Sequence, residues 1–283
     1  MMKKQKLGLM LIMLSVVFFI ACDKNDTMQE DLSVENIDLK TAETEAVIDE
    51  ATDETSVIIE EAYLTEEYPT TKSNALERYL PDCVTITKVI TQNMKTVTID
   101  FGEGCELRNG NFVSGKIIME YEKNPEAATK TISYTYEDFY FNDKNVTGGG
   151  SIFRELSNKN GNHQSTKKFD ITITWQDGLV ASKKGVKIRE WIEGFDTIAW
   201  GDNVFLITGN GIFTKKNGTV ISTEIIEPLR RELACKFLVS GIVSLTKNNN
   251  TTTLNYGDGS CDDLAQISIN GGKEKEIHLR GKK

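Results

Sequence analysis

The chain has 283 residues, of which 39% are hydrophobic, and a formal net charge of −9; this composition is ordinary for a soluble globular protein. The charge is uneven, because residues 23–72 contain sixteen acidic residues and three lysines, whereas residues 73–283 are close to neutral. Nucleic-acid binding depends on a clustered positive surface, so this distribution argues against a nucleic-acid partner.

The amino terminus has the layout of a bacterial lipoprotein signal peptide. A basic start precedes an apolar run over residues 7–21, which at fifteen residues is shorter than the roughly 20 needed to span a bilayer as a helix. The segment Phe19-Ile-Ala-Cys22 resembles a lipobox, although Phe19 stands where leucine is usual. We predict that the signal peptide 1–21 is removed and that Cys22 carries acyl chains such as palmitate. The mature protein is then attached to a membrane by lipid, without a transmembrane helix.

The acidic segment 22–72 is predicted to be a tether between this anchor and the rest of the chain. It contains no glycine and no aromatic residue before Tyr63, which suits an exposed segment. Between Thr41 and Leu64, apolar residues recur with a loose helical spacing. We expect a disordered linker that leads into one short helix and holds the body of the protein off the membrane.

Residues 73–283 are predicted to form a single antiparallel β domain. Runs rich in Val, Ile, Thr, Phe and Tyr alternate with Asn-Gly and Asp-Gly dipeptides, which favour tight hairpin turns because such turns need positive φ angles. The fold class is therefore all-β, either a sandwich or a curled extended sheet of about 12 to 14 strands. The expected strands lie near 84–91, 96–102, 114–122, 129–141, 145–156, 166–176, 185–195, 203–215, 219–226, 233–246, 251–257, 264–269 and 273–280.

Cysteine spacing predicts two disulfides. Apart from Cys22, four cysteines remain in a chain that is exported to an oxidising compartment. The midpoint of the first two is residue 94 and that of the last two is residue 248, and both midpoints fall within expected turns. Residues symmetric about a hairpin turn face each other, so we predict Cys83–Cys105 and Cys235–Cys261. They close two related hairpin units at about 83–122 and 235–280, each disulfide contributing about 3 kcal/mol.

Other motifs have weak chemical content, so we expect no catalytic residue, no metal site and no cofactor. The cysteines lack the close pairing of zinc ligands. Asp100-Phe-Gly102 matches a kinase triplet without the strand lysine and catalytic loop that accompany it. The aspartates of residues 258–263 lack the spacing of a calcium-binding EF-hand. The two histidines, His163 and His278, have no nucleophile motif to serve.

Aromatic residues mark the one segment where a ligand site is expected. Trp175, Trp191 and Trp200, together with tyrosines near residues 134–140, are a candidate platform for sugar rings. The alternative is that these rings fill the core of the β domain, where large aromatics contribute much of the buried area.

Six motifs along residues 78–280 are Pro81-Asp-Cys83, Asp100-Phe-Gly-Glu-Gly-Cys105, Gly115-Lys-Ile-Ile118, Arg189-Glu-Trp191, Phe205-Leu-Ile-Thr-Gly209 and Tyr256-Gly-Asp-Gly-Ser-Cys-Asp262. Together they resemble uncharacterised lipoproteins of the Bacteroidetes, and the paired Gly/Cys turns are the most specific part. The resemblance implies a Gram-negative host and hence the outer membrane, but no activity or ligand. It also favours reading Asp23-Lys-Asn-Asp26 as a signal for the cell surface, rather than as the inner-membrane retention signal of enterobacteria.

The sequence therefore favours a lipid-anchored envelope protein with a non-enzymatic binding or structural role. Its partner is expected to be a glycan, a peptide or an outer-membrane protein. The alternative is a hydrolase that acts on polysaccharide or peptidoglycan through a pair of carboxylates, since such pairs leave no linear signature.

The expected location leads to a direct test. If the protein faces outward, protease added to intact cells should remove it, while a periplasmic marker stays whole. Immunoblotting of cells before and after lysis measures this. A protein that survives until the cells are lysed is not surface-exposed.

Overall fold

The computed structural model describes residues 25–68, 79–124, 127–197, 199–248 and 250–279. The chain divides into two compact units, residues 1–37 and 38–283, and every strand belongs to the second unit. The predicted signal peptide 1–21 and the predicted lipidation site Cys22 lie outside the described residues.

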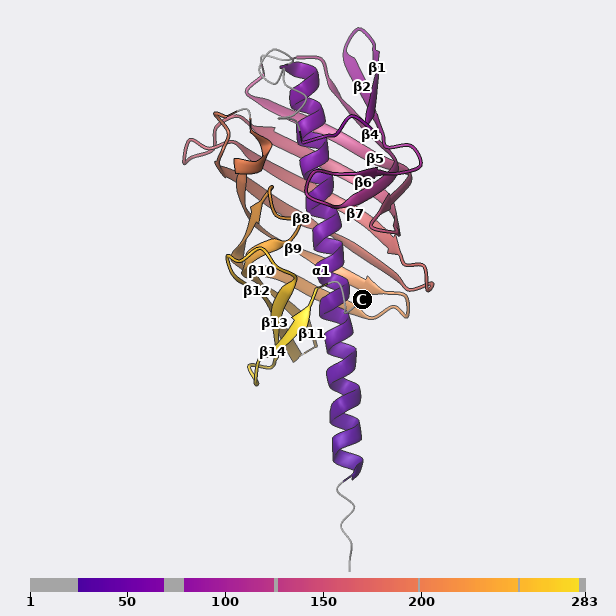
Figure 1. The fold of residues 1–283 in the computed structure, drawn as a ribbon, viewed down its shortest axis with the longest axis vertical. Coiled ribbons are helices and arrows are strands. Elements are labelled where there is room, and N and C mark those ends of the chain that lie inside the picture. Colours follow the sequence, from indigo (N-terminus) through magenta and orange to yellow (C-terminus); the bar gives the residue numbers. More distant parts are fainter. Residues whose placement is uncertain (1–24, 69–78, 125–126, 198, 249, 280–283) are drawn as a thin grey trace, which may run out of the picture. The chain divides into compact units, whose positions relative to one another are not determined.

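The second unit is built on one antiparallel sheet, as the curled-sheet alternative predicted, and the sandwich alternative is wrong (Figure 1). The sheet has 14 strands, and all but the short β3 follow one another in chain order, each pairing with the next. The strands are β1 (Thr85–Ile90), β2 (Met94–Asp100), β3 (Cys105–Glu106), β4 (Phe112–Glu122), β5 (Thr129–Phe141), β6 (Lys144–Glu155), β7 (Gln164–Thr174), β8 (Val180–Glu193), β9 (Val204–Lys215), β10 (Val220–Glu232), β11 (Leu238–Lys247), β12 (Asn250–Asp258), β13 (Leu264–Ile269) and β14 (Lys275–His278).

Local sequence explains this succession of hairpins. Gly178 and Gly218, in the turns before β8 and β10, both have a φ of 81°, which glycine adopts without steric cost. Along β5, Ile132 and Tyr134 are buried while Ser133 and Thr135 are exposed, so alternate side chains face opposite sides of the sheet as expected.

The predicted strand boundaries were wrong around β10. We expected one strand to end at residue 226 and the next to begin at 233, but β10 runs from Val220 to Glu232 through Pro228. Its register against both neighbours shifts between residues 224 and 231. Proline is tolerated in a sheet at such irregularities, because a missing N–H there breaks no regular ladder bond. The two-residue β3 was not predicted.

Both predicted disulfides are confirmed. Cys83 bonds to Cys105 and Cys235 to Cys261, with Cα atoms 5.9 and 5.8 Å apart. One lies beside the first strands in the sheet order and the other beside the last four, so each stabilises one end of the sheet.

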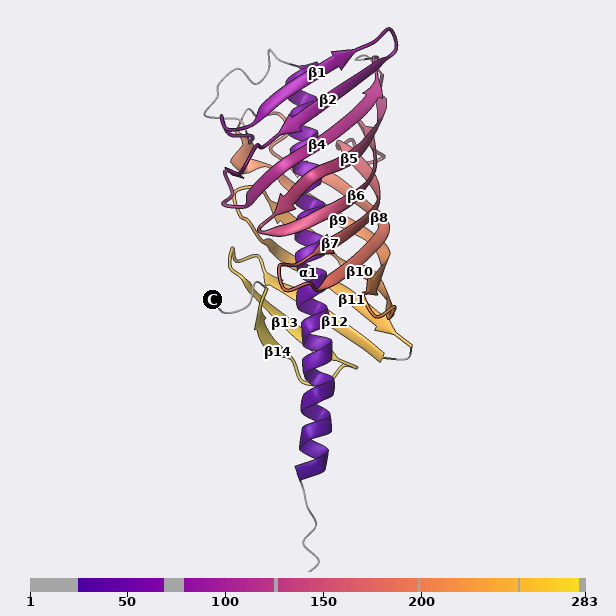
Figure 2. The same ribbon diagram turned by 90° about the vertical axis from the view of Figure 1, so that its right-hand side faces the viewer.

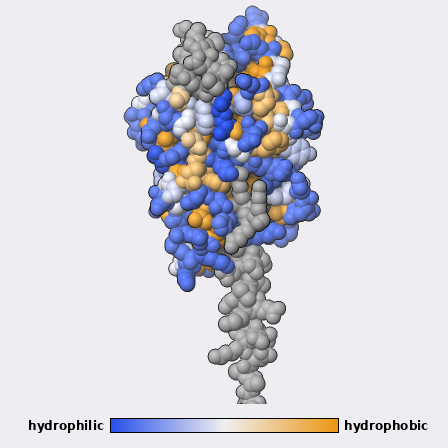
Figure 3. Space-filling view, in the orientation of Figure 1, coloured by the Kyte–Doolittle hydropathy of each residue, from blue (hydrophilic) through white to orange (hydrophobic). Residues whose placement is uncertain are grey.

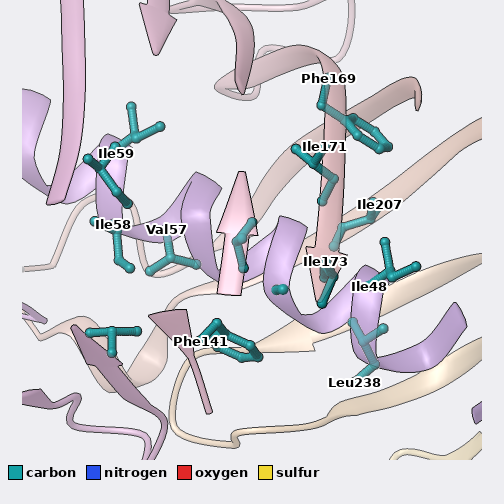
Figure 4. Packing of buried hydrophobic residues seen from close by; sticks show 14 of the residues in the cluster. Ile48, Val57, Ile58, Ile59, Phe141, Phe169, Ile171, Ile173, Ile207 and Leu238 are labelled. Atoms are coloured by element: carbon teal, nitrogen blue, oxygen red, sulfur yellow. The ribbon is translucent and has the colours of Figure 1, made fainter. Parts of the chain in front are cut away.

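The predicted helix is present but much longer than expected, since α1 spans Asn25–Glu67. The prediction that this segment is an exposed spacer is wrong for residues 41–64, most of which are buried in the second unit. The sheet curls around this part of α1 (Figure 2). Ile48, Ile58 and Ile59 are fully buried and belong to the same apolar cluster as side chains of the strands (Figure 4).

The acidic character of α1 is matched by basic residues on the inner face of the sheet. Burying a charge is costly unless it is paired, and the described strands bury eight Lys and Arg side chains. These are Lys95, Lys130, Arg154, Lys167, Lys183, Lys187, Arg189 and Arg231.

The ion pairs follow α1 in order. Lys183 contacts both Glu45 and Asp49, and its Nζ lies 2.9 Å from Asp49 Oδ1. Lys187 Nζ lies 2.6 Å from the same carboxylate oxygen. One helical turn further on, Arg231 Nε donates to Asp53 Oδ2 at 2.8 Å. The charge imbalance of the sequence is therefore resolved inside the protein, between one helix and the strands around it.

The two carboxylates that share Lys183 have pKa values shifted in opposite directions. Burial would raise the pKa of Asp49, but the ammonium groups of Lys183 and Lys187 outweigh it and lower that pKa to about 2. Burial raises the pKa of Glu45, which has the weaker cationic surroundings. The ionised form of Asp49 thus stabilises the fold.

Replacing Lys183 by methionine should lower the free energy of unfolding by about 3 to 5 kcal/mol, because it leaves buried Glu45 without its cation and Asp49 with Lys187 alone. The neighbouring Lys184 points to the opposite, exposed face, so Lys184→Met should change it by less than about 0.5 kcal/mol. Urea unfolding of both variants measures the difference. Equal effects would contradict a structural role for the buried ion pairs.

Asp49 also predicts a pH dependence. Its folded-state pKa lies below the usual value, so its contribution is present at neutral pH and is lost as the pH falls from about 4 towards 2. The difference in unfolding free energy between the wild type and Asp49→Asn should therefore shrink by about 2 kcal/mol over that range. Asp170→Asn, at an exposed position, serves as the control. A difference for Asp49→Asn that stays constant with pH would refute this assignment.

Candidate functional site

The outer face of the sheet, opposite α1, carries a hollow of about 1220 Å³ that crosses the seven consecutive strands β5 to β11. We call it the outer groove. Six spacings of 4.7 to 4.9 Å between neighbouring strands give it a length of about 29 Å. An open hollow of this length suits an extended ligand better than a compact one.

Two rows of side chains line the outer groove, with one residue from each strand in each row. Neighbours within a row are direct partners in the strand register. The first row is Ser133, Ser151, Lys168, Val186, Asn210, Glu224 and Ser244. The second row is Thr135, Gly149, Asp170, Lys184, Ile212, Ser222 and Thr246.

Glycines lie on the inner face of the sheet, opposite the hollow. Between the two rows, Gly150, Gly185 and Gly211 face inward and form one cross-strand line with Phe169. Glycine there leaves room on the inner face for the rings of Tyr134 and Phe169, which lie over Gly150 and Gly185. Gly209 beside this line has a φ of 145°, and a Cβ atom there would collide with the carbonyl oxygen of Val186. Other residues would therefore disturb the sheet there.

The lining is polar and carries balanced charge. Lys168 and Lys184 are matched by Asp170 and Glu224, and serine and threonine hydroxyls flank them towards both ends of the groove. Within the described residues, no hydrogen bond or ion pair holds any of these four charged side chains or the amide of Asn210. The groove thus presents donors and acceptors that are free to bind a ligand.

A third row beside the groove alternates hydroxyls with exposed apolar side chains. Phe153, Thr166, Ile188 and Thr208 are successive cross-strand partners on β6 to β9. Phe153 and Ile188 are 40% and 37% exposed, and Ile226, two residues beyond Glu224 on β10, is 51% exposed. Phe153 and Ile188 therefore lie two strands apart, which is about 10 Å, while Ile226 lies in the irregular part of β10 and has no register partner.

The structure does not bring the three tryptophans together. Trp191 is buried, and its indole nitrogen donates to the carbonyl oxygen of Glu193. Trp200 packs edge-on against Tyr79, and Trp175 lines a separate hollow beside α1. Within the described residues, no tryptophan ring contacts another, so the predicted flat platform does not form.

The tyrosines of that platform are also divided. Tyr134 is buried and Tyr136 packs against the core, where its hydroxyl lies 2.9 Å from that of Thr55 on α1. Only Tyr140 is exposed, at 43%. Most of these aromatic rings therefore pack in the core and do not form a platform for a ligand.

The other motifs hold turns together. Asp100 Oδ1 accepts a hydrogen bond from the backbone N–H of Gly102, and Asp262 Oδ1 accepts one from Leu264. Asp263 pairs with His278, 3.0 Å away. In the part of the chain that the structure describes, no group of three or more histidine, cysteine or acidic residues is placed so that it could hold a metal ion.

Figure 3 shows the face seen in Figure 1, and this surface is mainly hydrophilic with interspersed apolar residues. No helix among the described residues has the length and apolar character needed to cross a membrane.

Comparisons with protein-family models, with curated proteins and with solved structures find no match for this chain. The resemblance to Bacteroidetes lipoproteins stays a prediction, and the class of protein is defined by its architecture alone: an open, curled antiparallel sheet that encloses residues 41–64 of a long acidic helix.

The outer groove was not predicted from the sequence, although part of the signal was present. The turn at Asp177-Gly178 makes Asp170 and Lys184 symmetric, and the turn at Asn217-Gly218 does the same for Ile212 and Ser222. The arithmetic that paired the cysteines therefore also pairs residues of the second row. The hollow shape of the outer groove had no such signal in the sequence, because it depends on residues from several strands.

Proposed function

We propose that this chain is a lipid-anchored protein of the bacterial outer membrane, exposed at the cell surface, that binds a linear glycan in the outer groove without cleaving it. The lipobox at Cys22 supports the anchor, and the two disulfides fit an exported protein. The observation that carries the binding role is the pair of polar rows that cross seven strands.

The direction of the groove favours a glycan over a peptide. Peptides that bind sheets commonly add to an edge as a further strand, where main-chain hydrogen bonds hold them. The outer groove instead runs across the strands and offers side chains only, since the backbone groups of β5 to β11 are used within the sheet. Hydroxyls, an amide and both signs of charge suit the many hydroxyl groups of a polysaccharide.

The spacing of the apolar side chains supports the same ligand class. Phe153 and Ile188 lie in one row, two strands apart, at a spacing of about 10 Å. Successive disaccharide units of a β-linked glycan repeat at close to this distance, whereas alternate residues of an extended peptide repeat at about 7 Å. Phe153 also supplies an exposed ring against which a sugar can stack.

The balanced charge of the groove indicates which kind of glycan it can bind. The two lysines and two acids of the groove cancel, so a strongly anionic polymer gains little there. We therefore propose a neutral β-linked glycan, or one with few charges, as the ligand.

Nothing in the groove favours the alternative hydrolase. Its carboxylates, Asp170 and Glu224, lie on β7 and β10, three strand spacings apart, which is about 14 Å. Glycosidases hold their two carboxyl groups about 5 to 10 Å apart. This pair is too widely separated for that chemistry.

Binding can be tested by titrating neutral β-linked oligosaccharides of increasing length into the full-length protein. Affinity should rise with chain length until the groove, about 29 Å long, is filled. Lys184→Ala and Asn210→Ala should each weaken binding about five- to tenfold through lost hydrogen bonds. Ser222→Trp should abolish binding by obstructing the second row.

Lys123→Ala is the matched control, since Lys123 is exposed but lies outside the groove on the turn after β4. A control variant that loses as much affinity as Lys184→Ala would place the site elsewhere. Release of new reducing ends during incubation would instead favour the hydrolase.

A further inference from the structure

The inner face of the sheet contains a much smaller cavity, of about 20 Å³, beside Arg189. Arg154, Ser165 and Arg189 are direct cross-strand neighbours on β6, β7 and β8, and all three line it. Serine is the short side chain between two long ones, so a space remains above it. That space is large enough for one water-sized particle.

Arg189 points donors into this region that nothing in the described structure accepts. The residue is 6% exposed, and its Nε and Nη2 atoms are buried without a hydrogen-bond partner among the described residues. Its guanidinium lies 3.5 Å above the centre of the Phe205 ring, which fixes its orientation. A buried guanidinium with unused N–H groups is costly, so a missing acceptor is expected here.

The nearby carboxylates are already engaged. Asp53 Oδ1 lies 3.9 Å from Arg189 Nε, while Asp53 Oδ2 accepts a hydrogen bond from Arg231. Two carboxylates line the cavity itself: Glu60 is held by Arg154, whose Nε lies 2.8 Å from Glu60 Oε2, and Glu155 accepts a hydrogen bond from Gln164. Arg189 is therefore the cation of this cluster that lacks a hydrogen-bonded counter-charge.

His163 adds a further free donor or acceptor. Its Nδ1 atom is buried without a partner among the described residues, and the residue lines the cavity. Its ring stacks on Phe195 with 3.3 Å between ring centres, and Trp191 lies edge-on to both. Of these rings, His163 and Trp191 line the cavity.

We propose that this cavity binds one small anion of the size of chloride, held by Nε and Nη2 of Arg189, the hydroxyl of Ser165 and the Nδ1–H of His163. A water molecule would satisfy some of these donors but would not neutralise the guanidinium. The site is independent of the outer groove, which lies on the opposite face of the sheet.

Thermal unfolding of the full-length protein in detergent tests the proposal. Sodium chloride or sodium bromide should raise Tm by about 2 to 4 °C relative to sodium gluconate at the same ionic strength, because gluconate is too large for the cavity. Crystals grown in bromide should show an anomalous peak within hydrogen-bond distance of Arg189. No halide dependence together with no such peak would mean that the cavity holds water, and would overturn the proposal.

Two variants separate binding from a general salt effect. Arg189→Gln removes the charge and should abolish the Tm increase. Ser165→Val fills the cavity while keeping every charge, so it should abolish the increase even if Arg189→Gln fails to fold. Thr166→Val, on the opposite face of the same strand, should retain it. A full halide effect in Ser165→Val would exclude this cavity as the site.

Discussion

The pairing of an acidic helix with a basic sheet interior is the interaction on which the rest of this structure depends. Glu45, Asp49 and Asp53 lie one above another on α1, and Lys183 and Arg231 meet them from the strands. Removing a charge from water costs several kcal/mol, so neither surface is stable without the other. Residues 41–64 of the helix and the sheet are therefore one folding unit, and this part of the acidic segment is a structural element of the body rather than a spacer in front of it.

This pairing explains how one open sheet of 14 strands forms a core without a second sheet. A sheet must bury its apolar face against another element, and here a single helix takes that place. A helix buried on all sides is usually apolar all round. Residues 41–64 instead combine apolar, acidic and hydroxyl side chains, and the inner face supplies both apolar groups and cations to match them. Charge complementarity also fixes which residues of α1 meet which strands, a specificity that apolar contacts alone provide less well.

The interior and the outer surface are related. Gly150, Gly185 and Gly211 share one cross-strand line with the buried rings of Tyr134 and Phe169, and the outer groove lies directly behind this line. The concave surface on which we place glycan binding thus lies opposite a part of the core where glycines and aromatic rings meet. The same packing leaves Arg189 with unused donors beside Ser165, where we place a small anion. Both proposals arise from how side-chain size varies along neighbouring strands.

The sequence by itself determined most of the strands, their hairpin order and both disulfides, because these depend on contacts close in the chain; it missed β3 and the irregular course of β10. Asp170 and Lys184 are register partners across a single hairpin, whereas Cys83 precedes β1 and bonds to Cys105 of β3, just beyond the end of β2. Only the tertiary structure decided that the acidic helix is enclosed, that the three tryptophans are separated and that the outer face is hollowed. These features depend on which residues of distant strands share one face and on how the sheet curls, and hydrophobic periodicity within a single segment carries no information about either.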